Sequence, residues 1–209
     1  APVAPTVSLE AAVIRPVSKA EATQAPAGVV TIASEVGATV AVTFTGTAGS
    51  VVKNYTSTGS DGVVLTNDDL LALGEGTVNV AAIATDPAGN VGPAGTNSFV
   101  LDSIAPDTPV LALIAGADDP VSESEAIAAG GIVTVTGEAG AAIVVTLTGT
   151  SGTVTRGLTG TGTPQPVVLT GPDLVTLGDG TVAVTAVVTD EAGNDSPVGS
   201  LPSFTLDTV

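Results

Sequence analysis

Two short acidic segments occur twice in this chain of 209 residues. The first is Asp86-Pro-Ala-Gly-Asn90, and its near copy Asp190-Glu-Ala-Gly-Asn194 begins 104 positions later. The second is a Leu-Asp pair followed by Ser or Thr, with its aspartate at Asp102 and again at Asp207, 105 positions further on. Hard cations such as calcium bind about six to eight oxygens from carboxylates, carbonyls and water. The repeated acids are therefore candidate ligands of a metal ion.

The same aspartates have a simpler explanation as turn formers. An aspartate that begins a tight turn can accept hydrogen bonds from its own backbone, and asparagine tolerates the left-handed conformation that such turns require. Asp102 and Asp207 are also placed to cap the ends of strands. For each single aspartate the turn-forming role is at least as well supported as ligation. The clustering of acids at predicted domain ends, away from strand interiors, favours a metal for the set as a whole.

Residues for catalysis are scarce. The chain has no His and no Cys, so the usual general base and the thiol nucleophile are missing. Adjacent acids occur at Asp68-Asp69 and at Asp118-Asp119, but both pairs lie in predicted loop or turn segments, and no cleft is implied there. We therefore predict that the chain is not an enzyme.

The net charge of −17 restricts the partners of the chain. Its only cations are Arg15, Lys19, Lys53 and Arg156, so no basic patch exists that would displace counterions from phosphates. Nucleic acid is thus not an expected partner, and anionic membrane surfaces are disfavoured for the same reason. The sequence contains no run of about 18 apolar residues, so membrane insertion is not expected either.

The elements that position these acids are mainly strands. Thr39–Thr45 alternates apolar residues with threonine, as a half-buried strand does, and Thr77–Thr85 is a longer apolar strand. One helical turn is predicted at Asn67–Leu73, capped by Asn67 and closed by Gly74. Polar loops are predicted at 15–27 and 117–125. The other predicted strands are 7–14, 29–34, 51–57, 62–65, 97–101, 110–114, 132–136, 142–148, 152–158, 167–169, 181–189 and 203–206, with a second helical turn at 172–177.

Seven short strands in roughly 100 residues, separated by turns, are typical of an immunoglobulin-like sandwich. The repeat is too long for a solenoid unit, so each copy needs a core of its own. Aromatic residues make up only 2% of the chain, so this core must consist mainly of aliphatic side chains. We predict an all-β protein with two tandem immunoglobulin-like β-sandwich domains, residues 1–104 and 105–209.

The alternating direction of the strands predicts where the acids lie. Loops after the first, third and fifth strands should lie at the end where the chain leaves a domain, and the Asp190 turn should face the first domain. Arg15-Pro16 occupies the place of Asp119-Pro120, which counts against a complete copy of that part of the site in the first domain. The candidate calcium ligands are Asp102, Asp107, Asp190, Glu21, Asp69, Asp86, Asp118, Asp119, Glu125 and Asp207.

The combination of Asp-x-Ala-Gly-Asn with Leu101-Asp-Ser-Ile-Ala-Pro106 resembles the bacterial Ig-like repeats of large surface adhesins, namely the biofilm-associated and RTX type I-secreted adhesins. The resemblance covers essentially the whole chain, twice. It implies a monomeric extender segment on the extracellular bacterial surface that projects a distal binding region for adhesion and biofilm formation. It also implies that neighbouring repeats of the same chain are the partners and that calcium stiffens the junctions. The glycine-rich nonapeptide calcium repeats of that family are absent.

A ligand-binding module that recognises a glycan or a protein is the alternative function. Such modules normally interrupt the repeat with an insertion or an aromatic-lined loop. Here the copies have nearly equal length, and their largest local difference, Thr161–Pro166, is a Gly/Pro-rich loop without chemistry of its own. The function of a structural extender segment is therefore favoured over that of a ligand-binding module.

Overall fold

The computed structural model describes residues 1–10, 16–114 and 120–209. Within this part the chain divides into two units, Ala1–Ile104 and Ala105–Val209. The division falls at the predicted domain boundary, and independent folding of the two units stays a prediction. Asp118, Asp119 and Arg15 lie outside the described residues.

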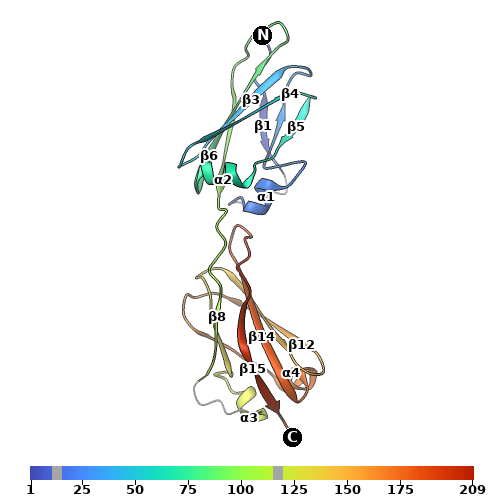
Figure 1. The fold of residues 1–209 in the computed structure, drawn as a ribbon, viewed down its shortest axis with the longest axis vertical. Coiled ribbons are helices and arrows are strands. Elements are labelled where there is room, and N and C mark those ends of the chain that lie inside the picture. Colours follow the sequence, from blue (N-terminus) through green and yellow to red (C-terminus); the bar gives the residue numbers. More distant parts are fainter. Residues whose placement is uncertain (11–15, 115–119) are drawn as a thin grey trace. The chain divides into compact units, whose positions relative to one another are not determined.

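Unit 1 consists of short strands and two short helices (Figure 1). Its elements are β1 (Thr6–Leu9), α1 (Lys19–Thr23), β2 (Val30–Ala33), β3 (Thr39–Thr45), β4 (Ser50–Thr56), β5 (Ser60–Val63), α2 (Asn67–Leu73), β6 (Gly76–Thr85) and β7 (Gly95–Leu101).

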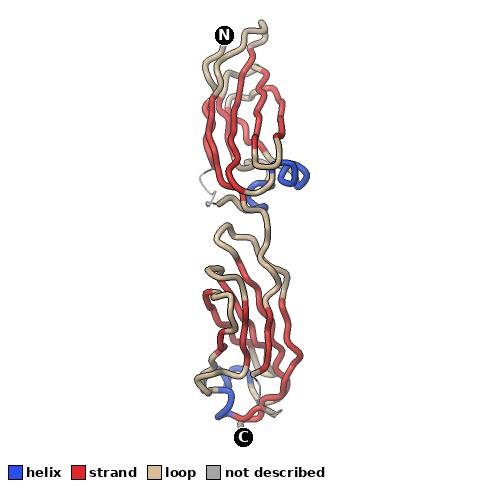
Figure 2. The backbone as a smooth tube through the Cα atoms, turned by 90° about the vertical axis from the view of Figure 1, so that its left-hand side faces the viewer, coloured by secondary structure: helices blue, strands red, loops and turns tan. Residues whose placement is uncertain are grey.

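The strands of unit 1 form two sheets, which Figure 2 shows as the red segments of its backbone. One sheet has the order β1-β2-β5, and the other has the order β4-β3-β6-β7. The long register between β3 and β6 runs from Thr39 opposite Thr85 to Thr45 opposite Asn79, and all neighbouring strands in both sheets are antiparallel. β4 pairs with β3 and not with β5, so the fourth strand belongs to the second sheet, unlike in constant-type immunoglobulin domains.

Unit 2 repeats this arrangement (Figure 1). Its sheets have the orders β13-β10-β8 and β12-β11-β14-β15-β9, and β9 pairs in parallel with the end of β15. Unit 1 has a single parallel bridge between Val17 and Leu101 at the corresponding place. The elements are β8 (Val110–Leu113), β9 (Val121–Ser122), α3 (Glu123–Ala126), β10 (Val133–Thr136), β11 (Ala142–Thr148), β12 (Thr153–Thr159), β13 (Gln165–Val167), α4 (Gly171–Leu177), β14 (Gly180–Thr189) and β15 (Gly199–Asp207).

Each unit has its own hydrophobic core between its two sheets. The alternation of the strands places one row of side chains inside, so β3 buries Val40, Val42 and Phe44 while the residues between them are more exposed. The rest of the core is largely Val, Leu, Ile and Ala, as the low aromatic content predicts. The all-β, immunoglobulin-like fold class predicted from the sequence is confirmed by these sheets.

The structure differs from the sequence prediction mainly at the polar loops. The short helix α1 lies within the segment 15–27, and α3 begins within the segment 117–125, both of which were predicted as loops. The N-cap of α2 is Thr66 and not Asn67, because the Thr66 side chain accepts a hydrogen bond from the backbone N–H of Asp69. Gly74 ends α2 as predicted, with a positive φ of 70° that a side chain would disfavour.

Among the residues described, no helix has the length and apolar character needed to cross a membrane.

Candidate functional site

The acids predicted as ligands lie at both ends of each unit. We call the end where the last strand finishes the exit end. In unit 1 the helices α1 and α2 lie at the exit end, as the alternating strand direction predicts (Figure 1). Val17, just before α1, donates its N–H to the carbonyl of Val100 at 2.7 Å, which ties this segment to the end of β7. The exit end of unit 1 therefore brings Glu21, Asp69 and Asp102 to the same side.

Glu21 and Glu125 close matching capping boxes on α1 and α3. The Oε2 of Glu21 accepts the backbone N–H of Ser18 at 3.0 Å, and the Oε2 of Glu125 accepts that of Ser122 at 2.9 Å. In return, each serine hydroxyl accepts the N–H of its glutamate, at 3.3 Å for Glu21 and 3.4 Å for Glu125. Both glutamates thus satisfy the first backbone groups of a helix, a role the sequence signals as Ser-x-x-Glu.

Asp69 is paired with a cation from the neighbouring edge strand. Its Oδ2 lies 2.5 Å from the Nζ of Lys53 on β4, and the same oxygen accepts the N–H of Thr66 at 2.6 Å. In unit 2 the equivalent of Lys53 is Arg156, 103 positions later, and the equivalent of Asp69 is Asp173, 104 positions later. The sequence places no basic residue near Asp69, but the fold brings Lys53 to it.

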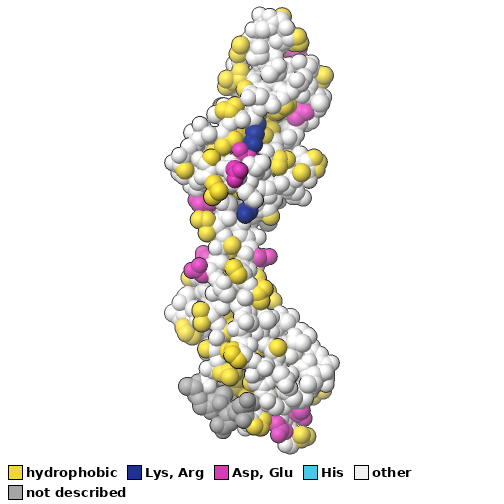
Figure 3. All heavy atoms as spheres, in the orientation of Figure 1, with side chains coloured by type: hydrophobic (Ala, Val, Ile, Leu, Met, Phe, Trp, Pro, Cys, Tyr) yellow, Lys and Arg dark blue, Asp and Glu magenta, His cyan; other side chains and the backbone are white. Residues whose placement is uncertain are grey.

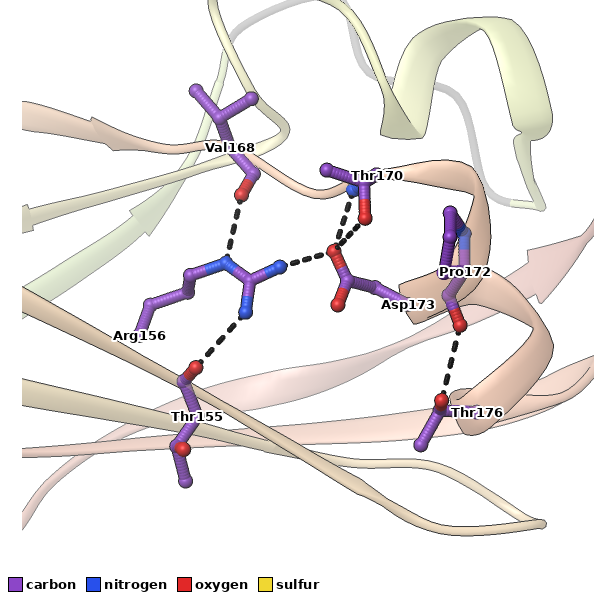
Figure 4. Close-up of polar contacts among 7 residues, drawn as sticks. All are labelled: Thr155, Arg156, Val168, Thr170, Pro172, Asp173 and Thr176. Carbon is purple, nitrogen blue, oxygen red and sulfur yellow. Dashed lines mark hydrogen bonds and ion pairs between the residues drawn. The ribbon is translucent and has the colours of Figure 1, made fainter.

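The equivalent network in unit 2 is built around Arg156 (Figure 4). Its guanidinium donates to the carboxylate of Asp173, and its Nε donates to the carbonyl of Val168 at 3.2 Å. The Oδ2 of Asp173 also accepts the backbone N–H of Thr170 at 2.6 Å, which caps α4. A strand cation therefore fixes a helix-capping aspartate in each unit.

These contacts control the charge state of both aspartates. Burial alone would raise the pKa of Asp69, but hydrogen bonds from Lys53 and Thr66 outweigh it and hold that pKa below its usual value. Burial is likewise outweighed at Asp173, where hydrogen bonds from Thr170 and Arg156 lower the pKa. Both carboxylates are therefore charged at neutral pH, and a cation already lies beside each of them.

Asp86 and Asp190 organise the turns after β6 and β14. The Oδ1 of Asp86 accepts the N–H of Asn90 at 2.8 Å, and its Oδ2 accepts the side-chain amide of Asn90 at 2.8 Å. Asp190 holds Asn194 in the same way, at 2.8 Å and 2.9 Å. Hydrogen bonds from the side chain and backbone of Asn90 lower the pKa of Asp86. The turn-forming role weighed for these motifs is therefore present in both copies.

Another pair of carboxylates, absent from the predicted set, holds a hydroxyl residue just beyond the last strand of each unit. The Oε2 of Glu75 accepts the N–H of Ser103 at 2.7 Å, and its Oε1 accepts the Ser103 hydroxyl at 2.5 Å. In unit 2 the Oδ1 of Asp179 accepts the N–H of Thr208 at 2.8 Å and its hydroxyl at 2.7 Å. The sequence signal was an acid before Gly76 and Gly180, matched with a hydroxyl residue after each Leu-Asp pair.

The remaining candidates show weaker contacts. The carboxylate of Asp102 accepts the N–H of Ile104 at 3.4 Å, and that of Asp207 accepts the N–H of Val209 at 3.4 Å. Asp107 is exposed. Their assignment as metal ligands stays a prediction.

A calcium site within one unit would bring several oxygen ligands close together. Among residues 1–10, 16–114 and 120–209, no three acidic side chains form a group that could hold a metal ion. The acids that lie near each other are occupied by helix caps, by turns or by Lys53 and Arg156. Within one unit, the described acids thus act in helix caps, turns and ion pairs.

Charged side chains, hollows and aromatic rings are the surface features that could bind a ligand. On the face drawn in Figure 3, acidic and hydrophobic side chains are scattered, with few basic ones between them. A hollow of about 310 Å³ at the exit end of unit 1 is lined by α2, Lys19, Glu75, Ser103 and Ile104. Phe44, Phe99 and Phe204 are buried in the cores, so none of them offers an exposed ring for sugar stacking.

Tyr55 has an unusual environment at the edge of unit 1. Its hydroxyl oxygen is buried, and no hydrogen-bond partner for it is found among the described residues. Burial, with a smaller contribution from the charge of Asp61, raises the pKa of Tyr55 to about 12. Asp61 itself accepts hydrogen bonds from Thr58 and from Ser57, whose Oγ lies 3.0 Å from the carboxylate.

The geometry thus defines a tandem β-sandwich whose polar networks brace turns and chain ends. No protein-family model matches the chain, and no curated protein matches it. Among solved structures, it is similar to a tetra-tandem repeat in the extending region of a large adhesion protein, with 24% identity and a TM-score of 0.38, over 99% of this chain and 50% of that one.

A second neighbour is an adhesin described as Ca²⁺-stabilized that helps an Antarctic bacterium to reach out and bind ice. It is 23% identical with a TM-score of 0.48, over 100% of this chain and 50% of that one. A third consists of fibronectin(III)-like modules of Clostridium thermocellum, 12% identical with a TM-score of 0.39, over 97% of this chain and 94% of that one. The neighbours include repeats of large bacterial adhesins, as the sequence resemblance predicted. At these identities and TM-scores we transfer no function from them.

Proposed function

We propose that the chain is a structural extender segment of a bacterial cell-surface adhesin. In this function it holds a distal binding region away from the cell and performs no catalysis. Its location is extracellular, and its partners are the neighbouring repeats of its own chain.

The repetition of structural bracing is the observation that supports this proposal. Apart from β9, both units have the same sheet order, and four polar networks recur in both. These are the serine–glutamate capping boxes, the strand cation on a helix cap, the Asp–Asn turns, and the carboxylate bound to Ser103 or Thr208. Repeated polar side chains are thus used to fix ends and turns. A ligand-binding module would instead concentrate different side chains in one copy, around a cleft or an exposed aromatic ring.

We further propose that calcium stiffens the junction between the two units. The connector 103–109 contains Pro106 and Pro109, which restrict its backbone, and Asp102 and Asp107 flank or occupy it. With 21 acids and four cations, the chain has carboxylates to supply for a hard cation. In this proposal the ion is bound by Asp102 or Asp107 together with Asp190.

Calorimetric titration with calcium, with thermal melts in calcium and in EDTA, tests the metal. A cation that binds only the folded protein raises the melting temperature by mass action. We expect a saturable binding heat and a higher melting temperature in millimolar calcium. Asp102→Asn combined with Asp190→Asn should abolish both effects, whereas Glu35→Gln, which changes an exposed glutamate of a turn, should leave them intact. Melts that superimpose across micromolar to millimolar calcium would remove the metal from the proposal.

A further inference from the structure

We call the hydroxyl residue just beyond the last strand of each unit the exit residue. Its contact with an acid is repeated with different side chains in the two units. Unit 1 uses Glu75 on Ser103, and unit 2 uses Asp179 on Thr208. The acid changes length and the hydroxyl residue gains a methyl group, yet in both units a carboxylate accepts both the backbone N–H and the side-chain hydroxyl. We call this contact the exit clamp. Its chemistry is retained between copies that differ in sequence.

Each clamp acid is itself anchored to the body of its unit. The hydroxyl of Thr47, in the turn between β3 and β4, donates to the carbonyl of Glu75 at 2.8 Å. Thr150 donates to the carbonyl of Asp179 at 2.8 Å in unit 2. The acids also directly precede Gly76 and Gly180, the first residues of the central strands β6 and β14. The exit residue is thereby connected through one side chain to the central strands of the sheet.

The last strand is held on both of its edges just before the clamp. β7 pairs with β6 along one edge, and on the other edge Asp102 donates its N–H to the carbonyl of Val17 at 2.9 Å. In unit 2, β9 provides this second edge by pairing Val121 with Leu206 and Ser122 with Asp207. Ladder bonds lie roughly across the strand direction, so a pull along the strand shears several bonds together. The exit clamp is the side-chain contact that ties the chain just beyond this strand to the start of the central strand.

We infer that the exit clamp transfers tension from the chain beyond the last strand into the central strand of each unit. The inference rests on the proposed extender function, because a segment that holds a distal region is pulled through its chain ends. Hydrogen bonds to an ionised carboxylate are stronger than neutral ones, and two of them on one residue resist displacement in more than one direction. The hydroxyl supplies one of these bonds and the backbone supplies the other.

Single-molecule pulling on the full chain tests the clamp. The sequence has no Cys, so introduced cysteines define the points of attachment. Cysteines at positions 1 and 209 load both units through their ends, whereas Val36→Cys with Ser50→Cys loads unit 1 without passing through Ser103. All measurements are made in EDTA, so their outcome does not depend on the proposed calcium site.

Under end loading, Glu75→Gln should raise the unfolding rate of one of the two units at fixed force by about tenfold, the loss expected for one charge-assisted hydrogen bond. Ser103→Ala, which keeps the backbone donor, should act in the same direction, and Ser103→Thr, which copies unit 2, should have no effect. Asp179→Asn should weaken the other unit. Glu35→Gln is the control for the loss of one negative charge.

Two results would overturn the inference. One is an unchanged unfolding rate for Glu75→Gln and Ser103→Ala under end loading. The other is an equal acceleration when unit 1 is loaded through positions 36 and 50, which would make the contact an ordinary stabilising bond. Neither result bears on calcium binding, which the melts and the titration decide separately.

Discussion

At the scale of single residues, the cations of β4 and β12 are each paired with an aspartate of a helix. Lys53 points inward from the edge strand β4 and pairs with Asp69 of α2. Arg156 of the edge strand β12 pairs with Asp173 of α4 in the same way. An inward-facing charge on an edge strand also discourages pairing with another chain. The pairing is thus a structural device of the sandwich, although the acids alone had suggested metal ligation.

A double-mutant cycle on Lys53→Gln and Asp69→Asn measures the first pair. The side chains retain 29% and 14% of their exposure, so solvent screens the interaction and the coupling should be modest, about 0.5–1 kcal/mol. Urea denaturation of the four proteins gives the coupling, and the same cycle on Arg156 and Asp173 provides the matched control. A coupling free energy indistinguishable from zero in both units would show that the ion pairs do not stabilise the fold.

The burial of the Tyr55 hydroxyl can be tested directly by spectroscopy, because Tyr55 is the only tyrosine and the chain has no tryptophan. Its folded pKa of about 12 lies above the ordinary value of 10.0, since burial disfavours the tyrosinate. The stability that Tyr55 contributes is therefore present below pH 10 and is lost as the pH rises towards 12. We expect the ultraviolet band of the tyrosinate to titrate near 12 in the folded protein and near 10 in urea. A midpoint of 10 in both would contradict the burial of this hydroxyl.

At the scale of elements, the short helices depend on their caps more than on their length. The helix α1 has five residues and α3 has four, too few for a helix to be stable by itself. Their starts are fixed because Ser18 and Ser122 exchange hydrogen bonds with Glu21 and Glu125.

Replacement of Ser18 by alanine should therefore lower the free energy of unfolding by about 1 kcal/mol. Ser18 is buried, and the change leaves the backbone N–H of Glu21 without its side-chain acceptor. Ser18→Thr should retain most of the stability, and Ser98→Ala, at an exposed position in β7, is the control. Chemical denaturation is the measurement, and equal stability of Ser18→Ala and the unchanged protein would refute the capping role.

The strands were largely predictable from the sequence, and the site was not. Thr39–Thr45 shows its strand in a period of two, and the structure has the same bounds. The helices α1 and α3 were missed because so few residues have no helical period, although Ser18-x-x-Glu21 is a capping signature. The pairing of Lys53 with Asp69 depends on how β4 packs against α2, which spacing along the chain does not reveal. The same holds for Glu75 and Ser103, which are 28 positions apart.

At the scale of the whole molecule, function depends on whether the two units move independently. Carboxylates collected at a junction repel one another without a cation, and a bound ion would remove that repulsion and link the units. In the proposed arrangement, carboxylates from both units bind the ion. Calcium should then narrow the range of angles between the units without changing the fold of either.

Small-angle X-ray scattering of the whole chain in calcium and in EDTA tests this central claim most directly. We expect a sharper maximum dimension in calcium, and a broader distribution of distances in EDTA. Asp102→Ala combined with Asp190→Ala should give the EDTA curve even when calcium is present. Scattering curves that superimpose with and without calcium would contradict a metal-stiffened extender and leave the junction carboxylates with only their roles in turns and strand ends.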